Sequence, residues 1–118
     1  MNPEEQLVLD DLFGDAGVGV TEVVEGGRHL FILPKVNLPA GSVPAAAFGI
    51  YHASAHGGYS TRLFLEQPIK GANGTTPQTT TEVFFGRTMH AASWNGVPAD
   101  LLPHEGILAH LQLYEATP

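Results

Sequence analysis

The chain contains no cysteine in its 118 residues. Disulfide bonds, thiolate-ligated zinc, iron–sulfur clusters and every mechanism that uses a thiol nucleophile are therefore excluded for this sequence. Long hydrophobic stretches are absent as well, and none approaches the roughly 20 apolar residues that a membrane-spanning helix needs. We expect no membrane partner. The N-terminal sequence lacks the positive start and apolar run of a signal peptide, which predicts a cytoplasmic location.

Positive charge is also scarce, with five Lys and Arg residues against twelve Asp and Glu residues and a formal net charge of −7. The five cations are scattered along the chain, whereas phosphate binding requires a concentrated positive surface, so nucleic acid is not expected as a partner. Hydrophobic residues make up 43% of the chain, which is too many for a disordered protein. We expect residues 1–118 to form a single domain around one core.

The first residues carry the signals of a helix. Asn2 can cap its N-terminus, Pro3 suits the first helical position, and Glu5 can complete a capping box. Gly14 can end the helix, so the sequence predicts a helix of about 11 residues.

The middle of the chain is dominated by strand patterns. The runs "VTEVVE" and "RHLFIL" flank Gly26-Gly27, which is typical of a tight hairpin. Further strand candidates are "AAAFGIYH", "STRLFLEQP" and the short "EVFF", and the intervening "IKGANGTTPQTTT" is predicted to be a polar loop. An irregular loop is then expected from Gly86 to Gly106.

A change of period near Asp100 predicts a second helix. Leu101, Leu108, Leu111 and Tyr114 recur at helical spacing with Ile107 alongside, and Asp100 is a suitable cap. We therefore expect an α+β fold with an N-terminal helix, an antiparallel meander of four or five strands, an irregular loop and a C-terminal helix packed on one face of the sheet.

Two histidines form the clearest candidate for metal chemistry. His52 and His56 are spaced i, i+4, which on a helix would direct both imidazoles to one metal ion, but this segment follows a strand and ends in two glycines. No third ligand has a recognisable spacing. Histidines that form local hydrogen bonds or face water are the alternative interpretation.

Other catalytic signatures are not matched. Ser93 lies three residues from His90, but no turn of the G-x-S-x-G type presents a nucleophile, and hydrogen bonding within a turn explains Ser93 as well. The glycine-rich segments match no nucleotide-binding motif, so we predict no cofactor and assign no catalytic residue. Trp94, the only tryptophan, is expected to anchor the loop onto the core; an exposed Trp94 would indicate a contact with a partner.

Three segments, taken together, resemble a known family. They are "GGRHLFILPKVNLPAGSVPAAAFGIYH", "GGYSTRLFLEQPI" and "FGRTMHAASWNGVPADLLPHEGILAHLQLYE", and they are similar to the hairpin with its Pro-Gly turn, the Tyr-Pro segment with its following strand, and the loop and last helix of family E of the prokaryotic ubiquitin-conjugating-like domains. The resemblance covers roughly residues 18 to 115. It implies a ubiquitin-conjugating-enzyme-like fold, and it implies a ubiquitin-like protein and an adenylating activating enzyme as partners.

The same comparison implies a protein without the conjugating activity. The Tyr-Pro of the fold is Tyr59-Ser60 here, and Ser93-Trp94-Asn95 replaces the Ser-Arg-His element of the family, which leaves His90 as a candidate for its loop histidine. The family's reaction passes through a Cys thioester, and this chain has no Cys. We therefore expect a bacterial adaptor module whose interaction loop contains His90, Ser93, Trp94 and Asn95.

Two alternatives from other classes stay open. A small metal-binding protein or His-dependent enzyme would use His52 and His56, with His90 or His104 as a further ligand. A structural subunit would instead self-assemble into a homo-oligomer, because an open meander leaves a sheet edge to be covered.

Overall fold

The helix α1 (Pro3–Phe13) begins and ends as the sequence predicts in this computed structural model, which describes residues 1–94 and 97–115. The Asn2 side chain accepts a hydrogen bond from the Glu4 backbone N–H at 2.7 Å, and Gly14 follows the last turn. Leu9 and Phe13 are buried at i, i+4 spacing. The capping-box prediction for Glu5 is wrong, because its carboxylate binds His104 instead.

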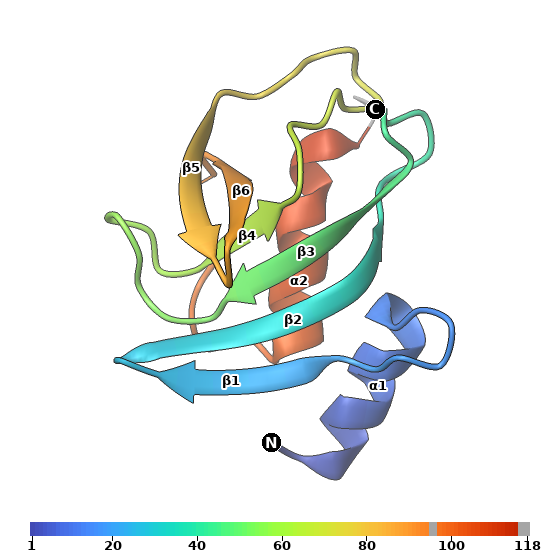
Figure 1. Ribbon diagram of the computed structural model, residues 1–118. Helices are drawn as coiled ribbons and strands as arrows, with labels where there is room; N and C mark the ends of the chain where they lie inside the picture. Colours follow the sequence, from blue (N-terminus) through green and yellow to red (C-terminus); the bar gives the residue numbers. More distant parts are fainter. Residues whose placement is uncertain (95–96, 116–118) are drawn as a thin grey trace.

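A single antiparallel sheet follows (Figure 1). Its strands are β1 (Thr21–Glu25), β2 (Arg28–Asn37), β3 (Ala46–His52), β4 (Arg62–Leu65), β5 (Thr79–Phe84) and β6 (Arg87–Ala92). The order across the sheet is β1-β2-β3-β4-β6-β5, so β1 and β5 are its edges. Gly26 and Gly27, both with positive φ, form the predicted tight turn between β1 and β2.

The sheet has six strands, one more than the upper limit of the sequence prediction, and the predicted loop from Gly86 is wrong over its first part. Residues 87–92 pair with β5 in regular register, from Phe84↔Arg87 to Thr79↔Ala92. The tract Thr79–Thr81 belongs to β5 rather than to a polar loop, which agrees with the preference of β-branched residues for strands.

The C-terminal helix α2 (Pro103–Leu111) continues into a short 3₁₀-helix η1 (Gln112–Tyr114). The prediction that Asp100 caps this helix is wrong: Leu102 occupies the cap position, and Glu105 accepts a hydrogen bond from its N–H at 3.0 Å. Neither α1 nor α2 is long and apolar enough for a bilayer span, within the part of the chain that the structure describes.

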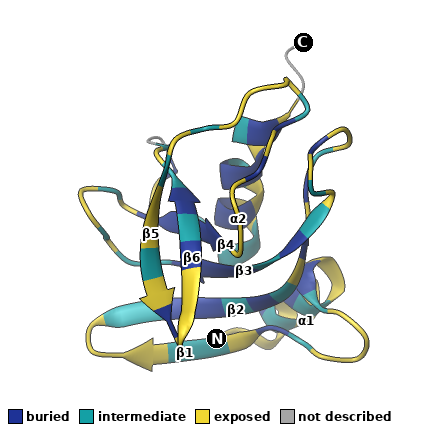
Figure 2. Cartoon of the chain, turned by 45° about the horizontal axis from the view of Figure 1, so that its top comes forward, coloured by how far each residue is buried: buried dark blue, intermediate teal, exposed yellow. Residues whose placement is uncertain are grey.

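Both faces of the sheet bury apolar side chains. One face packs against α1 and α2 through a core that includes Phe31, Tyr51, Leu65 and Ile107. Because alternate residues of a strand point to opposite faces, their neighbours fill a second core on the other side, whose members are Leu30, Ile50, Phe64, Phe84, Met89 and Ala91. The fold is therefore α+β, with both helices on one face of the sheet (Figures 1 and 2).

The sheet curls around this second core. Arg28, at the start of β2, lies over the ring of Phe84, at the end of β5, with 5.1 Å from its guanidinium carbon to the ring centroid. Three strands separate β2 from β5 in the sheet order, so only a strongly twisted sheet can bring these two residues together. In Figure 1 the β5–β6 hairpin accordingly runs at a steep angle to β1, β2 and β3.

Candidate functional site

The predicted interaction loop begins on a strand. His90 lies within β6, where it is paired with Leu65 and Thr81, and it is half-buried. Ser93 follows the end of β6 and is exposed, while Trp94 is half-buried. Asn95, the fourth residue of the prediction, lies outside the described residues. The structure thus places His90, Ser93 and Trp94 along one continuous segment that leads from the sheet toward α2.

Trp94 lies against the helix-side core. It lines a cavity of only about 10 Å³ together with Leu63, Ala92, His110, Leu113 and Tyr114. A space of this size holds at most about one water molecule, so the side chain of Trp94 has no room for a ligand beneath it. This position is compatible with the expected packing role, and the residue is half-buried rather than fully enclosed.

A polar network that the sequence did not indicate lies near this cavity. The Thr61 hydroxyl and His110 Nε2 are 2.9 Å apart, and Thr61 Oγ1 also donates to the carbonyl of Val97 at 3.4 Å. Burial, and to a smaller extent the charge of Arg62, lower the pKa of His110 to about 4. His110 is therefore neutral at physiological pH.

A hydroxyl beside a histidine can serve as a nucleophile and its base, but this pair is not arranged for catalysis. Thr61 is 2% exposed and His110 is 6% exposed, so no substrate reaches either group in this structure. A base with a pKa near 4 is also a poor match for proton transfer at neutral pH. The pair instead ties Val97, which follows the interaction segment, to the inner face of α2.

His52 and His56 lie side by side, with ring centroids 5.0 Å apart. His52 Nδ1 donates to the carbonyl of Ser54 at 2.7 Å, and burial lowers the pKa of His52. His56 Nε2 lies 2.9 Å from Glu82 Oε2, and its buried Nδ1 has no hydrogen-bond partner among the described residues. Each imidazole is thus fixed through one nitrogen, His52 by the local carbonyl of Ser54 and His56 by the carboxylate of Glu82 on β5.

A metal site needs more ligands than these two residues supply. Over residues 1–94 and 97–115, no group of three or more His, Cys, Asp or Glu side chains is arranged to hold a metal ion. His104 makes a different contact, because its Nδ1 and its backbone N–H both bind the Glu5 carboxylate, at 2.6 and 2.8 Å. The structure does not bring His90 or His104 into a common cluster with His52 and His56.

Arg62 is a buried cation without a carboxylate partner within the described chain. Its Nη2 donates to the carbonyls of Ala91 and Ala92, each at 3.2 Å, and its guanidinium stacks on Tyr59 at 4.4 Å from the ring centroid. Burial lowers the pKa of Arg62, although a guanidinium stays protonated. Arg62 therefore fixes the last residues of β6, directly before Ser93 and Trp94.

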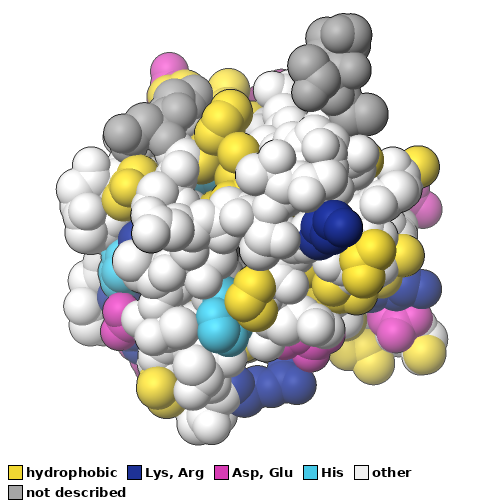
Figure 3. Space-filling model, turned by 90° about the horizontal axis from the view of Figure 1, so that it is seen from above, with side chains coloured by type: hydrophobic (Ala, Val, Ile, Leu, Met, Phe, Trp, Pro, Cys, Tyr) yellow, Lys and Arg dark blue, Asp and Glu magenta, His cyan; other side chains and the backbone are white. Residues whose placement is uncertain are grey.

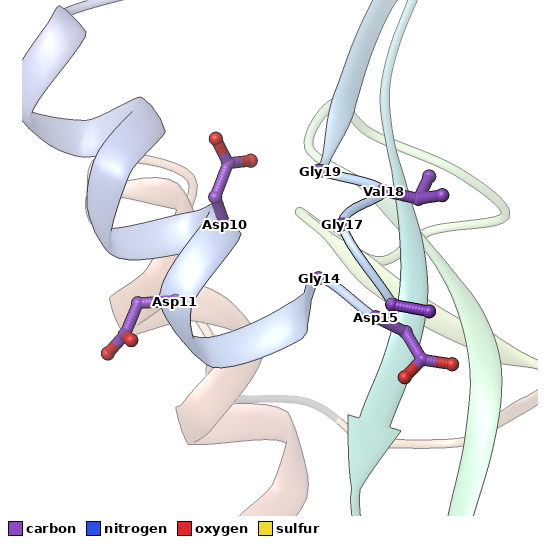
Figure 4. A pocket seen from close by; sticks show the side chains of 8 residues that line it. Asp10, Asp11, Gly14, Asp15, Gly17, Val18 and Gly19 are labelled. Atoms are coloured by element: carbon purple, nitrogen blue, oxygen red, sulfur yellow. The ribbon is translucent and has the colours of Figure 1, made fainter.

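A hollow on the described surface lies elsewhere, between the end of α1 and the loop that leads to β1 (Figure 4). It measures about 380 Å³ and is lined by Asp10, Asp11 and residues 14–19. Asp10 Oδ1 accepts hydrogen bonds from Val20 N–H and from the Gln6 side chain, both at 2.7 Å. Asp11 and Asp15 point away from each other in Figure 4, so the carboxylates do not converge on one ligand.

Charged side chains do not form a field of one sign on the face shown in Figure 3, where a few basic and acidic groups lie among uncharged polar and single hydrophobic side chains. Comparison with protein-family models, curated proteins and solved structures found no match to this chain. The structure establishes an α+β fold with an N-terminal helix, a six-stranded antiparallel sheet and a C-terminal helix, and it assigns the chain to no family.

Proposed function

We propose that this chain is a non-catalytic ubiquitin-conjugating-like domain, which acts as a cytoplasmic binding or adaptor module in a bacterial ubiquitin-like modification system. The observation that carries the proposal is the order of its elements. Helix α1 precedes an antiparallel meander of β1, β2, β3 and β4, and α2 packs on the same face as α1. The domains that the sequence resembles share this order; the β5–β6 hairpin extends the sheet before α2.

The chemistry of the described residues favours binding over conjugation. A thioester requires a Cys, and the chain has none. Ser93 is exposed, but a serine would form a stable ester and is a weak nucleophile without a base beside it. The hydroxyl of Thr61 lies beside His110, but both residues are buried.

The segment from His90 to Trp94 is the proposed contact surface. Within this segment, Arg62 holds the carbonyls of Ala91 and Ala92, so the exposed Ser93 and the half-buried Trp94 follow directly after a fixed strand end. A segment that is already ordered loses little conformational entropy on binding, which favours recognition by a preformed surface.

An amide-spectrum titration tests this proposal. We expect a ubiquitin-like protein or an adenylating enzyme of this system to shift the resonances of Ser93 and of the Trp94 indole. Ser93→Arg should weaken this binding at least about tenfold, because it places a bulky charge in the contact. Thr21→Arg, an equivalent change of an exposed hydroxyl residue on β1, serves as the control. Unchanged spectra at high micromolar concentrations of both proteins would remove the proposal.

A metal-binding function is the second candidate, and the free ring nitrogen of His56 favours it. A neighbour that fixes the opposite nitrogen is the usual setting of a metal-ligating histidine. Here a third ligand would have to come from outside the described residues. Elemental analysis of untagged protein, with thermal shifts on adding zinc, nickel or manganese, decides this case: sub-stoichiometric metal without a shift excludes it.

A further inference from the structure

The two edges of the sheet differ in how they are protected from pairing with another strand. Edge strands expose backbone N–H and C=O groups, and proteins usually blunt them with charged side chains, proline, bulges or short length. β1 is five residues long and carries Glu22 and Glu25, and the N-terminal amine lies 3.6 Å from the Glu22 carboxylate. β5 is six residues long, contains no proline and a single charged residue, and pairs with β6 in unbroken register (Figure 1). β5 is thus the unprotected edge.

The backbone direction of each β5 residue follows from its pairing with β6. The Ser93 N–H donates to the Gln78 carbonyl at 3.4 Å, so Gln78 faces β6. Because the direction alternates along an antiparallel strand, every second residue from Gln78 onward also faces β6. The residues between them turn their backbone N–H and C=O groups away from the sheet; they are Thr79, Thr81 and Val83. No other strand of residues 1–94 and 97–115 lies beside these groups.

This edge is complementary to itself. When two copies pair antiparallel around Thr81, Thr81 meets Thr81 and Thr79 meets Val83, so each outward N–H faces a carbonyl of the second copy. The paired side chains are all β-branched, which favours strand pairing. Glu82 then lies opposite Thr80 of the second copy. A register centred on Glu82 would instead oppose two carboxylates, which is destabilising.

Charge also favours this edge for a contact between copies. The formal net charge is −7, so two molecules repel each other least where acidic side chains are few. The one acidic residue of β5, Glu82, is held by His56 Nε2 at 2.9 Å. Pro77 precedes the strand and has no N–H, so it ends the row of outward donors. The self-complementary stretch is therefore confined to residues 79–83.

We propose that the chain forms a two-fold symmetric dimer in which β5 pairs antiparallel with β5 of a second copy, centred on Thr81. The two six-stranded sheets then join into one continuous sheet. A contact of this size belongs to the weak and reversible class. The inference goes beyond the proposed function and does not depend on it, because the second copy is the only partner required.

Thr81→Pro tests the pairing, because it removes the central outward N–H and leaves the groups that bind β6 in place. Sedimentation of the wild-type chain from about 1 μM to 1 mM should show a monomer–dimer equilibrium. T81P should raise the dissociation constant of the dimer at least about tenfold. Thr81→Lys opposes two cations in the same register and should have a similar effect.

Val24 on β1 provides the matched controls. The His29 carbonyl accepts a hydrogen bond from the Ala53 N–H at 2.8 Å, so His29 faces β3 and its β1 neighbour Val24 faces outward. Val24 is also exposed. Val24→Pro and Val24→Lys therefore make the same two changes on the other edge, and both should leave the dissociation constant unchanged.

Amide hydrogen exchange locates the contact. The N–H groups of Thr79, Thr81 and Val83 should exchange more slowly at concentrations where the dimer forms, and concentration-independent exchange at all three would overturn the proposal. A wild-type chain that stays monomeric at about 1 mM would overturn it as well. So would a dimer that T81K leaves intact, which decides the question even if T81P does not fold, or a dimer that the Val24 variants dissociate. Each of these results concerns the chain alone and leaves the proposed function standing.

Discussion

At the scale of single residues, the Glu5 carboxylate joins the two helices. It is 5% exposed and accepts hydrogen bonds from the backbone N–H and the ring of His104. Glu5→Gln replaces one of the accepting oxygens with an NH₂ group, which cannot accept a hydrogen bond from His104. We therefore expect a loss of about 1–3 kcal/mol in the free energy of unfolding. Urea unfolding measures this loss. The control is Glu4→Gln at an exposed residue, and its free energy of unfolding should stay within about 0.5 kcal/mol of wild type. Equal effects of the two substitutions would show that the contact is not stabilising.

His110 predicts a pH dependence of stability. Its pKa is lowered to about 4 in the folded protein from a usual value of about 6.5, so the unfolded chain binds the proton more readily between these values. Neutral His110 contributes fully to the free energy of unfolding above about pH 6.5. This contribution, on the order of 3 kcal/mol, is lost as the pH falls to about 4. The lowered pKa of His52 acts in the same direction.

Unfolding measured across this pH range tests the assignment. His110→Gln keeps a partner for Thr61 and removes the titrating group, so the slope between pH 6.5 and 4 should become shallower. Thr88→Gln, at an exposed residue of β6 that does not titrate, should retain the wild-type slope. A slope that is unchanged by H110Q would assign the acid sensitivity to other groups.

The residues that the sequence could not identify are mainly buried polar ones. Arg62 and His110 have no local signal, because their burial depends on which strands and helices meet. The Glu5 prediction failed for the same reason, since a capping box and a long-range partner compete for one carboxylate. Asn2, whose role is purely local, was correctly predicted as the cap.

At the scale of elements, α2 crosses β3 very closely at Gly106. A Cβ at this position would overlap the Tyr51 hydroxyl. Gly→Ala in a helix normally stabilises by about 1 kcal/mol, whereas here we expect Gly106→Ala to destabilise by about 1–3 kcal/mol because of overpacking.

A double-mutant cycle with Tyr51→Phe, measured by urea unfolding, checks the geometry. Tyr51→Phe removes the hydroxyl oxygen, which is the atom closest to the new Cβ. The loss of unfolding free energy caused by G106A should therefore be smaller in the Y51F protein. Strictly additive costs would contradict the close crossing.

The sequence predicted most elements where the turn signals were standard. Gly26-Gly27 marks the first hairpin correctly. Phe85-Gly86 does not have the sequence of a favoured turn, so β6 was missed even though its neighbour β5 is rich in β-branched residues. In α2 the spacing indicated Leu108 as a core residue, but Leu108 is 44% exposed and Ile107 is fully buried, because the angle at which the helix crosses the sheet selects the buried face.

At the scale of the whole molecule, each face of the single sheet packs against a core of its own. The curl of this sheet could not be predicted from the sequence, since it depends on contacts such as Arg28 with Phe84. Neither core can lose its packing without disturbing strands that the other requires. We therefore predict a single cooperative unfolding transition.

Two local probes can test this cooperativity, because each core has a distinctive residue. Met89 lies in the second core, and Trp94 lies beside the helix-side core. In urea, the methionine methyl resonance and the tryptophan fluorescence should change with the same midpoint and slope. Different midpoints would show that the β5–β6 side unfolds independently.

The bond between Glu5 and His104 also sets an order of events during synthesis. Its two residues are 99 positions apart, so the ribosome must add almost a whole domain before the first helix meets its anchor. At about 5–20 residues per second, this interval is on the order of 5–20 s. During that time α1 lacks its contact with α2, so the two helices can join only after the sheet between them has been synthesised.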